Sequence, residues 1–252
     1  MARRRQSLSG RAATLSGVIA FGEEAQRKLQ SLEQRDEELN RIRAGLAKID
    51  TEILRAGKEL SALRRKLIPQ LSKAIVRQLS ALGFKQSQFE VAIETTDAPT
   101  ASGSFPTFGL DTVEFQFAPN LGEPGQPLRA IASSGELARV MLALKTVLAM
   151  EDEIPVLVFD EVDANVGGET ANAVGEKMQQ IARQRQVICV THLAPVAAHA
   201  DAHYVVSKQV KAGRTVSEMT LLENEDRVTE LARMLGGQSA AARKHAEALL
   251  RV

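Results

Sequence analysis

Two adjacent acids, Asp160 and Glu161, follow directly on the apolar run VLVF of residues 156–159. Two carboxylates this close repel each other unless a cation lies between them and a substrate. An aspartate at the end of an apolar strand is suited to hold Mg²⁺, and a glutamate beside it can act as general base on a water molecule. The alternative is an acidic turn that caps the next helix. The pair therefore marks a candidate metal and catalytic site.

A second candidate stretch is IASSGELARVMLALK, residues 131–145. Ser133, Ser134 and Gly135 open an apolar helical pattern there. The start of a helix with small residues offers free backbone N–H groups and the positive end of the helix dipole, which suits a phosphate. The alternative is a plain serine N-cap with Glu136 as its partner three positions on, and this stretch alone favours the alternative.

A third stretch, VICVTHLAPVAAHA, places Thr191 and His192 just past an apolar run. A histidine at the end of a strand can donate to a phosphate or hold a water molecule. A lone histidine is more often an ordinary surface or core residue, and we interpret the other three histidines in that way: His199, His203 and His245.

An α/β fold must position these residues. Apolar or alternating runs predict strands at 89–95, 112–117, 156–160, 187–191, 203–208 and 215–222, and helical patterns lie near 135–150, 168–183, 230–237 and 241–250. Strands that alternate with helices and are apolar throughout are typical of a partly parallel, covered sheet. Ligands of such sheets bind beyond the carboxyl ends of the strands, where the acids are expected.

Residues from about 22 to 80 predict a long helix. From Leu39 to Leu67 the apolar positions recur at a strict alternation of three and four residues, which is the seam of a coiled coil. The alternative is an amphipathic helix lying on a globular core. The seam, for which the chain shows no obvious partner helix, consists of Leu39, Ile42, Leu46, Ile49, Ile53, Ala56, Leu60, Leu63 and Leu67.

Charge and composition suggest two modules. Residues 1–80 carry 17 Lys and Arg against 9 Asp and Glu, whereas the whole chain of 252 residues has a net charge of only +1. The basic part could meet a polyanion or could be a solvated helix face. One cysteine, in an apolar run, fits a reducing compartment and an inert thiol. No apolar stretch reaches the ~18 residues that would span a bilayer, and the basic start MARRRQSLSG has no apolar segment of a signal peptide behind it.

The order of these motifs resembles the C-terminal lobe of an ABC-type ATPase head, which carries the signature motif, Walker B, D-loop and H-loop. A coiled coil that runs into the lobe is similar to the SMC branch of this superfamily, and more narrowly to a bacterial family of DNA repair ATPases. The motifs that carry the resemblance are IASSGELARVMLALK, VFDEVDANVGG, VICVTHLAPVAAHADAHYVVSK and ELARMLGG. The resemblance implies residues 1–80 as basic segment and coiled-coil arm, and 81–252 as the lobe.

The resemblance also implies roles for individual residues. Asp160 would be the Walker B acid at the Mg²⁺ site, and Glu161 the catalytic base. Asp163 would lie in the D-loop at the interface between two heads, and His192 would be the switch histidine. The signature residues that would contact ATP held by a partner head are Ser133, Ser134, Gly135 and Glu136. The family pattern usually has glycine where Ser134 stands, and a serine would be strained if that position needs φ > 0.

The phosphate-binding pattern GxxxxGK[ST] does not occur in the sequence. The resemblance places it, with the partner strand of the coiled coil, in an N-terminal ATPase half. It further implies a cytoplasmic, nucleoid-associated protein that acts in DNA double-strand break repair and recombination. By the same resemblance, the protein is expected to form a homodimer through its heads. With 4% aromatic residues, DNA contact would be through phosphates and sensitive to salt. The alternatives are a non-catalytic scaffold that keeps the lobe and, less favoured, a transporter subunit.

Overall fold

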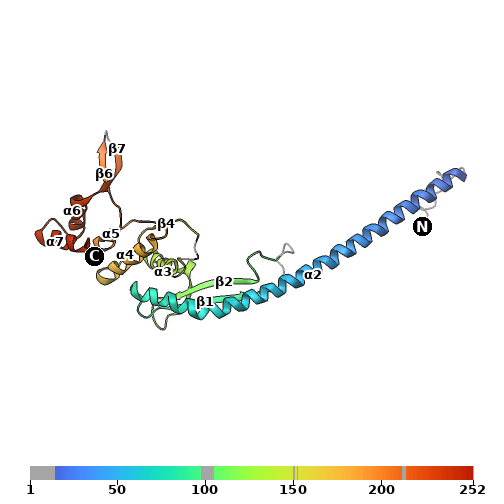
Figure 1. Ribbon diagram of the computed structural model, residues 1–252, viewed down its shortest axis with the longest axis horizontal. Coiled ribbons are helices and arrows are strands. Elements are labelled where there is room, and N and C mark those ends of the chain that lie inside the picture. The colour runs from blue at the N-terminus through green and yellow to red at the C-terminus, as the bar shows by residue number, and fades with distance from the viewer. Residues whose placement is uncertain (1–14, 98–104, 150, 152, 212–213, 252) are drawn as a thin grey trace. The chain divides into compact units, whose positions relative to one another are not determined.

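The computed structural model describes residues 15–97, 105–149, 151, 153–211 and 214–251 (Figure 1). The chain divides into two compact units, one formed by Met1–Ala62 with Thr95–Asp111 and the other by Leu63–Glu94 with Thr112–Val252. The helix α2 (Leu15–Ala81) contributes to both units and confirms the long helix that the sequence predicts. The functional division at residue 80, into a coiled-coil segment and an ATPase lobe, stays a prediction.

In the first unit, a buried polar cluster joins α2 to the ends of two strands, β1 (Gln88–Thr95) and β2 (Asp111–Ala118). The Asp111 side chain is 3% exposed. Its Oδ1 accepts hydrogen bonds from Ser61 Oγ at 2.7 Å and from Thr95 Oγ1 at 2.8 Å. One turn earlier, Gly57 lets the helix approach closely, since a Cβ there would lie 2.5 Å from Cγ of Leu110. The strand ends are therefore fixed to α2 at two adjacent turns.

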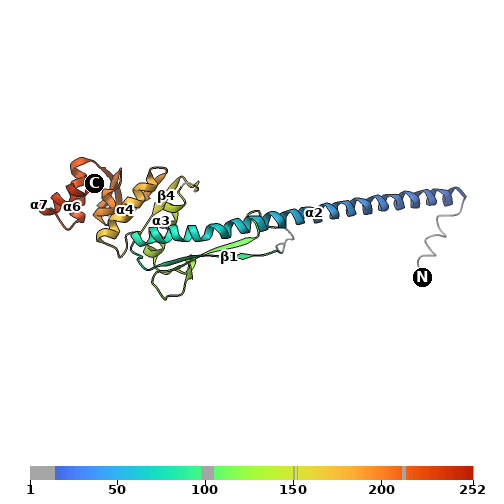
Figure 2. The same cartoon turned by 60° about the horizontal axis from the view of Figure 1, so that its bottom comes forward.

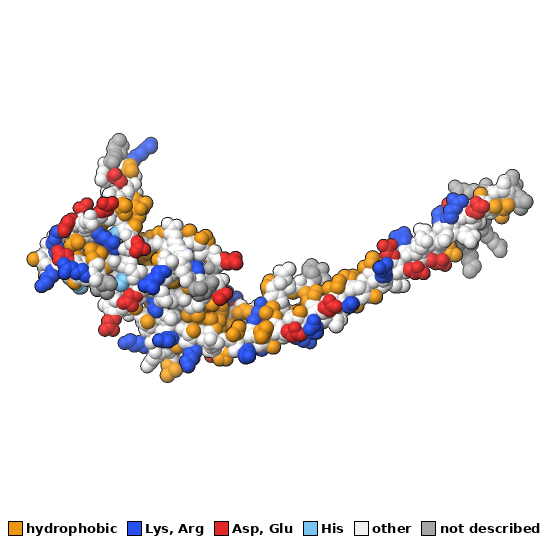
Figure 3. Space-filling model, viewed as in Figure 1, with side chains coloured by type: hydrophobic (Ala, Val, Ile, Leu, Met, Phe, Trp, Pro, Cys, Tyr) orange, Lys and Arg blue, Asp and Glu red, His pale blue; other side chains and the backbone are white. Residues whose placement is uncertain are grey.

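The apolar seam of α2 lies on the surface. Hydrophobic side chains recur along this helix on the face that Figure 3 shows, and Leu39, Leu46 and Leu67 are 47%, 55% and 59% exposed. Leucines left in water at this regular spacing favour the coiled-coil interpretation over a helix that lies on a core. The pairing itself stays a prediction, because the described residues include no second helix along the seam.

The second unit is built on a core that begins with the last turns of α2. Ile75 and Leu79 are fully buried there. Gly83, with φ of 97°, follows the helix end, where a glycine in this conformation commonly ends a helix. Phe84 then packs edge-on against Phe117 of β2, with the ring centroids 5.1 Å apart. β1, β2 and the short β3 (Gln126–Pro127) form one sheet in that order, and β2 pairs with β3 antiparallel.

The same core continues into the part of the unit that carries the motifs. β4 (Val156–Phe159) and β5 (Gln186–Cys189) pair in parallel, in a register that sets Phe159 beside Cys189. Figure 2 shows α3 (Ser134–Val147) and α4 (Gly168–Ala182) near β4, and α4 contacts both α3 and β5. Leu157 and Phe159 of β4 point into this core.

The other face of β4 and β5 is open, which differs from the covered sheet that the sequence predicts. Val158 is 66% exposed and Val190, just after β5, is 59% exposed, with Val156 and Ile188 also on the surface. Apart from Gln186 at the start of β5 the two strands are apolar, yet the described residues of this chain cover only one of their two faces. Burial of both faces therefore requires residues other than these.

The remaining elements form a second, smaller core. α5 (Ala194–Ala198), α6 (Asn224–Met234) and α7 (Ala240–Leu249) meet around the fully buried Leu231, Ala232 and Ala246. β6 (His203–Lys211) and β7 (Arg214–Leu222) confirm the two strands that the sequence predicts there, and the structure adds that they pair antiparallel. The sequence does not predict α5, β3 or the 3₁₀ turn Leu128–Ala130, which are too short to show a period. Among the described residues, no helix has the length and apolar character needed to cross a membrane.

Replacing Asp111 by alanine is expected to lower the free energy of unfolding by about 1–3 kcal/mol, because the hydroxyl of the buried Ser61 and that of Thr95 lose their acceptor. Urea unfolding followed by circular dichroism measures this change. Asp97→Ala is the matched control, since Asp97 forms an exposed ion pair with Lys58 at 3.2 Å. Its loss should cost no more than about 1 kcal/mol. Equal losses in the two variants would contradict a buried role for Asp111.

Candidate functional site

The predicted acids stand at the carboxyl edge of the parallel strand pair. Asp160 and Glu161 follow β4 and are exposed, and Thr191 and His192 follow β5. The ladder extends to this edge, where Val190 N–H donates to the carbonyl of Phe159 at 2.9 Å. Because the strands are parallel neighbours, the residues after them meet at one edge, as expected for a ligand site of an open α/β sheet.

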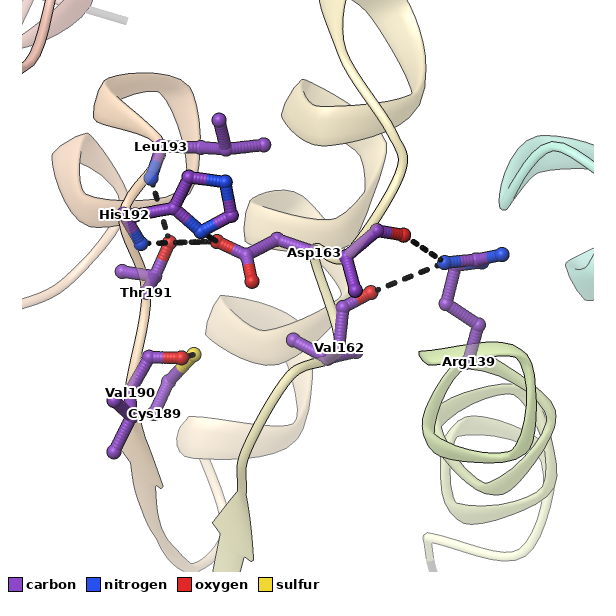
Figure 4. A network of polar contacts seen from close by, with 9 residues as sticks. Arg139, Val162, Asp163, Cys189, Val190, Thr191, His192 and Leu193 are labelled. Carbon is purple, nitrogen blue, oxygen red and sulfur yellow. Dashed lines mark hydrogen bonds and ion pairs between the residues drawn. The ribbon is translucent and has the colours of Figure 1, made fainter. Parts of the chain in front are cut away.

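Hydrogen bonds to the Asp163 side chain connect the residues that follow β4 with those that follow β5 (Figure 4). This side chain is 2% exposed. The carboxylate Oδ2 accepts from the Thr191 hydroxyl and from the backbone N–H of His192 at 3.1 Å, and His192 Nδ1 lies 3.4 Å from the same oxygen. Thr191 Oγ1 in turn accepts from Leu193 N–H at 3.0 Å. In this structure the Asp163 carboxylate thus faces inward, onto the loop after β5.

The start of α3 forms the third side of the site. Ser133 is the N-cap, and its Oγ accepts from Glu136 N–H at 3.4 Å. Ser134 Oγ donates to the carboxylate of Glu161. Gly135 lies against the acidic turn, which comprises residues 161–165. A Cβ at this glycine would lie 2.9 Å from Cβ of Ala164 and 3.1 Å from the Glu161 carbonyl oxygen. The serine-cap alternative is therefore present, but the helix start is also in contact with the acids.

Two residues of the acidic turn have a strained backbone. Glu161 has φ of 55° and Asn165 has φ of 59°, a region that residues with a Cβ seldom adopt. Among the described residues other than glycine, only Asn224 shares it. Ser134 does not, so the strain that a serine in place of glycine could have caused is absent at this position of α3. The strain lies on the predicted general base instead.

The Cys189 thiol is half-buried close to the carboxylates of the site, and both its burial and their charge change its chemistry. Burial raises the pKa of Cys189 to about 12, and the negative charges of Asp163 and Asp160 act in the same direction. Its Sγ donates weakly to the Val190 carbonyl at 3.7 Å. Cys189 is therefore an inert thiol, as the apolar run around it predicts.

The donor set fits Mg²⁺ only together with a phosphate. Among the described residues, no three His, Cys, Asp or Glu side chains converge into a site that could hold a metal ion alone. Mg²⁺ usually keeps several waters and binds through one or two carboxylates and substrate phosphates. Asp160, exposed at the strand end with Glu161 beside it, matches that sparse requirement.

Sequence reasoning missed Arg139 as part of this site. Its guanidinium Nη1 donates to the carbonyls of Ala164 at 3.0 Å and Val162 at 3.5 Å, within the acidic turn. The available signal was a charge inside the apolar pattern of residues 137–144, next to the buried Val140. In the sequence Thr191 stands out only as the neighbour of His192, although its hydroxyl donates to Asp163.

The fold is that of the C-terminal lobe of an ABC/SMC-type ATPase head, with a long helix before it. A crystal structure of an Smc head domain with coiled coil and joint, from Pyrococcus yayanosii, matches 91% of this chain and 41% of that one, with a TM-score of 0.55 and 19% identity. No model of a known protein family matches the chain.

Curated sequences give the particular family. The DNA repair protein RecN of Treponema pallidum is 41% identical over 240 residues, which are 94% of this chain and 42% of that protein. The RecN of Deinococcus radiodurans is 41% identical over 94% of the chain, and that of Bacillus subtilis 31% over 95%. The chain belongs to the RecN family as its C-terminal part, and it spans about two-fifths of the length of these relatives.

At pH 8, a disulfide reagent should react with Cys189 in the folded chain about a hundredfold or more slowly than in the unfolded chain, because the reactive thiolate forms only as the pH approaches a pKa of about 12. The release of thionitrobenzoate from Ellman's reagent measures both rates. The chain holds one cysteine, so the signal belongs to this residue. Equal rates with and without denaturant would show that the thiol is accessible and unperturbed.

Proposed function

We propose that this chain is the C-terminal half of a composite ATPase that acts in DNA double-strand break repair and recombination, with ATP bound and hydrolysed between two heads. The observation that carries the proposal is the meeting of three motifs at one edge. The helix start with Ser133 to Gly135, the acids after β4 and His192 after β5 are joined by the contacts of Asp163 and Glu161.

Each proposed role follows from chemistry at that edge. Glu161 is the general base that takes a proton from the attacking water, for which its carboxylate must exchange the Ser134 hydroxyl for that water. Asp160 holds Mg²⁺, which when bound offsets negative charge on the phosphates. The His192 side chain is 72% exposed although its Nδ1 lies 3.4 Å from Asp163 Oδ2. Its ring would approach a terminal phosphate by leaving this contact, while the backbone N–H stays bonded to Asp163.

The signature residues face a second head in this proposal. The start of α3 presents backbone N–H groups and the positive end of the helix dipole, which attract a phosphate held elsewhere. Ser133, Ser134, Gly135 and Glu136 would therefore contact ATP bound by a partner copy, and Asp163 would belong to the loop that meets it. The protein would act as a homodimer joined through its heads.

An N-terminal half completes the head. The chain matches about 42% of the length of its RecN relative in Treponema pallidum and contains no GxxxxGK[ST]. The open apolar face with Val158 and Val190, and the exposed seam of α2, are surfaces that such a half would cover. It would supply the loop that cradles the phosphates and the second strand of the coiled coil.

DNA is the proposed partner of the assembly, since the relatives are DNA repair proteins. With 4% aromatic residues the contacts would be to phosphates, and affinity would fall with salt. Candidates on α2 are Arg64, Arg65 and Lys66, of which Arg65 and Lys66 are exposed and Arg64 is half-buried. Arg3, Arg4 and Arg5 lie outside the described residues. A cytoplasmic, nucleoid-associated location fits this partner.

Glu161→Gln in the complete protein should leave ATP binding within about threefold of wild type and lower kcat by a factor of about 10²–10⁴, because the amide cannot accept the proton from water. Steady-state phosphate release measures kcat, and a fluorescent ATP analogue measures binding. Normal turnover in this variant would refute the role of Glu161.

Glu169→Gln is the matched control, because Glu169 is an exposed glutamate in the first turn of α4. It removes the same charge eight residues away and should leave kcat unchanged. If the complete wild-type protein binds no ATP at all, the ATPase proposal fails and the non-catalytic scaffold is favoured.

A further inference from the structure

Arg139 is a buried charge in the middle of α3. It is 7% exposed and is followed by the fully buried Val140. Burial lowers the pKa of its guanidinium, while the nearby Glu136 acts in the opposite direction. A cation taken out of water is costly unless polar groups replace its hydration. The polar groups that replace the hydration of the Arg139 guanidinium therefore indicate the role of this residue.

Those contacts lead to the acidic turn (Figure 4). Nη1 donates to the Ala164 carbonyl at 3.0 Å and to the Val162 carbonyl at 3.5 Å. The guanidinium carbon lies 5.0 Å from the centroid of the Phe84 ring, in a cation–π contact. Arg139 therefore binds backbone of the turn between the catalytic acids and α4.

The turn needs an external support. Glu161 and Asn165, near its two ends, both have positive φ, and such strain persists only where the surroundings impose it. Within the turn, Ala164 N–H donates to the Glu161 carbonyl at 3.0 Å. One helical turn before Arg139, α3 approaches the turn so closely at Gly135 that a Cβ there would lie 2.9 Å from Cβ of Ala164 and 3.1 Å from the Glu161 carbonyl oxygen. Two successive turns of α3, at Gly135 and at Arg139, thus contact the 161–165 turn.

We propose that Arg139 is a positioning residue that holds the 161–165 turn against the start of α3. It thereby fixes the position of the general base, Glu161, relative to the signature residues at the start of α3. Its effect on turnover rests on the proposed ATPase function; its effect on the turn does not. The residue touches no reacting atom and acts through the carbonyls of Val162 and Ala164.

The test uses the complete protein with three variants: Arg139→Met, Arg139→Lys and, as matched control, the exposed Arg183→Met. Arg139→Met should lower kcat about tenfold or more with KM changed less than about threefold, because the base is displaced while the binding groups remain. Arg139→Lys should recover part of kcat, since an ammonium can still donate to one carbonyl. Arg183→Met should match wild type.

Amide hydrogen exchange gives a readout that does not depend on ATPase activity. Exchange of the Ala164 amide should rise about tenfold in Arg139→Lys, while the Val190 amide, bonded to Phe159 in the strand ladder, keeps its protection. Unchanged Ala164 exchange and kcat would overturn the proposal, and a uniform rise that includes Val190 would reduce Arg139 to a core residue. If Arg139→Met does not fold, the lysine variant decides. A wild type without turnover would refute the ATPase function alone.

Discussion

The site depends on one buried charge, the carboxylate of Asp163. At 2% exposure of its side chain this group has lost its water, and an unpaired buried carboxylate would cost several kcal/mol of a total stability of about 5–15 kcal/mol. Its donors are the Thr191 hydroxyl and the His192 backbone N–H. These donors can reach it because β4 and β5 are parallel neighbours whose ends lie at one edge. The requirement to satisfy Asp163 therefore places His192 beside the acids.

The same requirement explains why the acidic turn can hold a strained conformation. Asp163 anchors the middle of the turn on one side, and Arg139 and Gly135 fix it on the other. Contacts from two elements over-determine the backbone between them, which is the condition under which positive φ at Glu161 can persist. A glutamate here is held away from its relaxed backbone, and its carboxylate is directed toward Ser134.

Much of this arrangement could be predicted from local patterns. The apolar runs gave the strands, the period of α2 gave the long helix, and the rule that ligands lie at strand ends brought Asp160, Glu161 and His192 to one edge. What could not be predicted are contacts between residues distant in sequence. Arg139 looked like one more helix charge, and nothing in the residue type of Glu161 indicates φ of 55°. The inward orientation of Asp163 likewise depends on a loop 28 residues away.

For the open face of the sheet, the local sequence pattern predicts burial that the structure shows on only one of the two faces. Apolar strands predicted burial on both sides, but Val156 and Val158 are exposed on one. Asp160 continues their spacing of two, and side chains two apart along a strand lie on the same face. Asp160 is exposed as they are. Residues that buried these valines would therefore also lie beside Asp160. Under the proposed function, binding of the N-terminal half would bury the open face and complete the metal site at the same time.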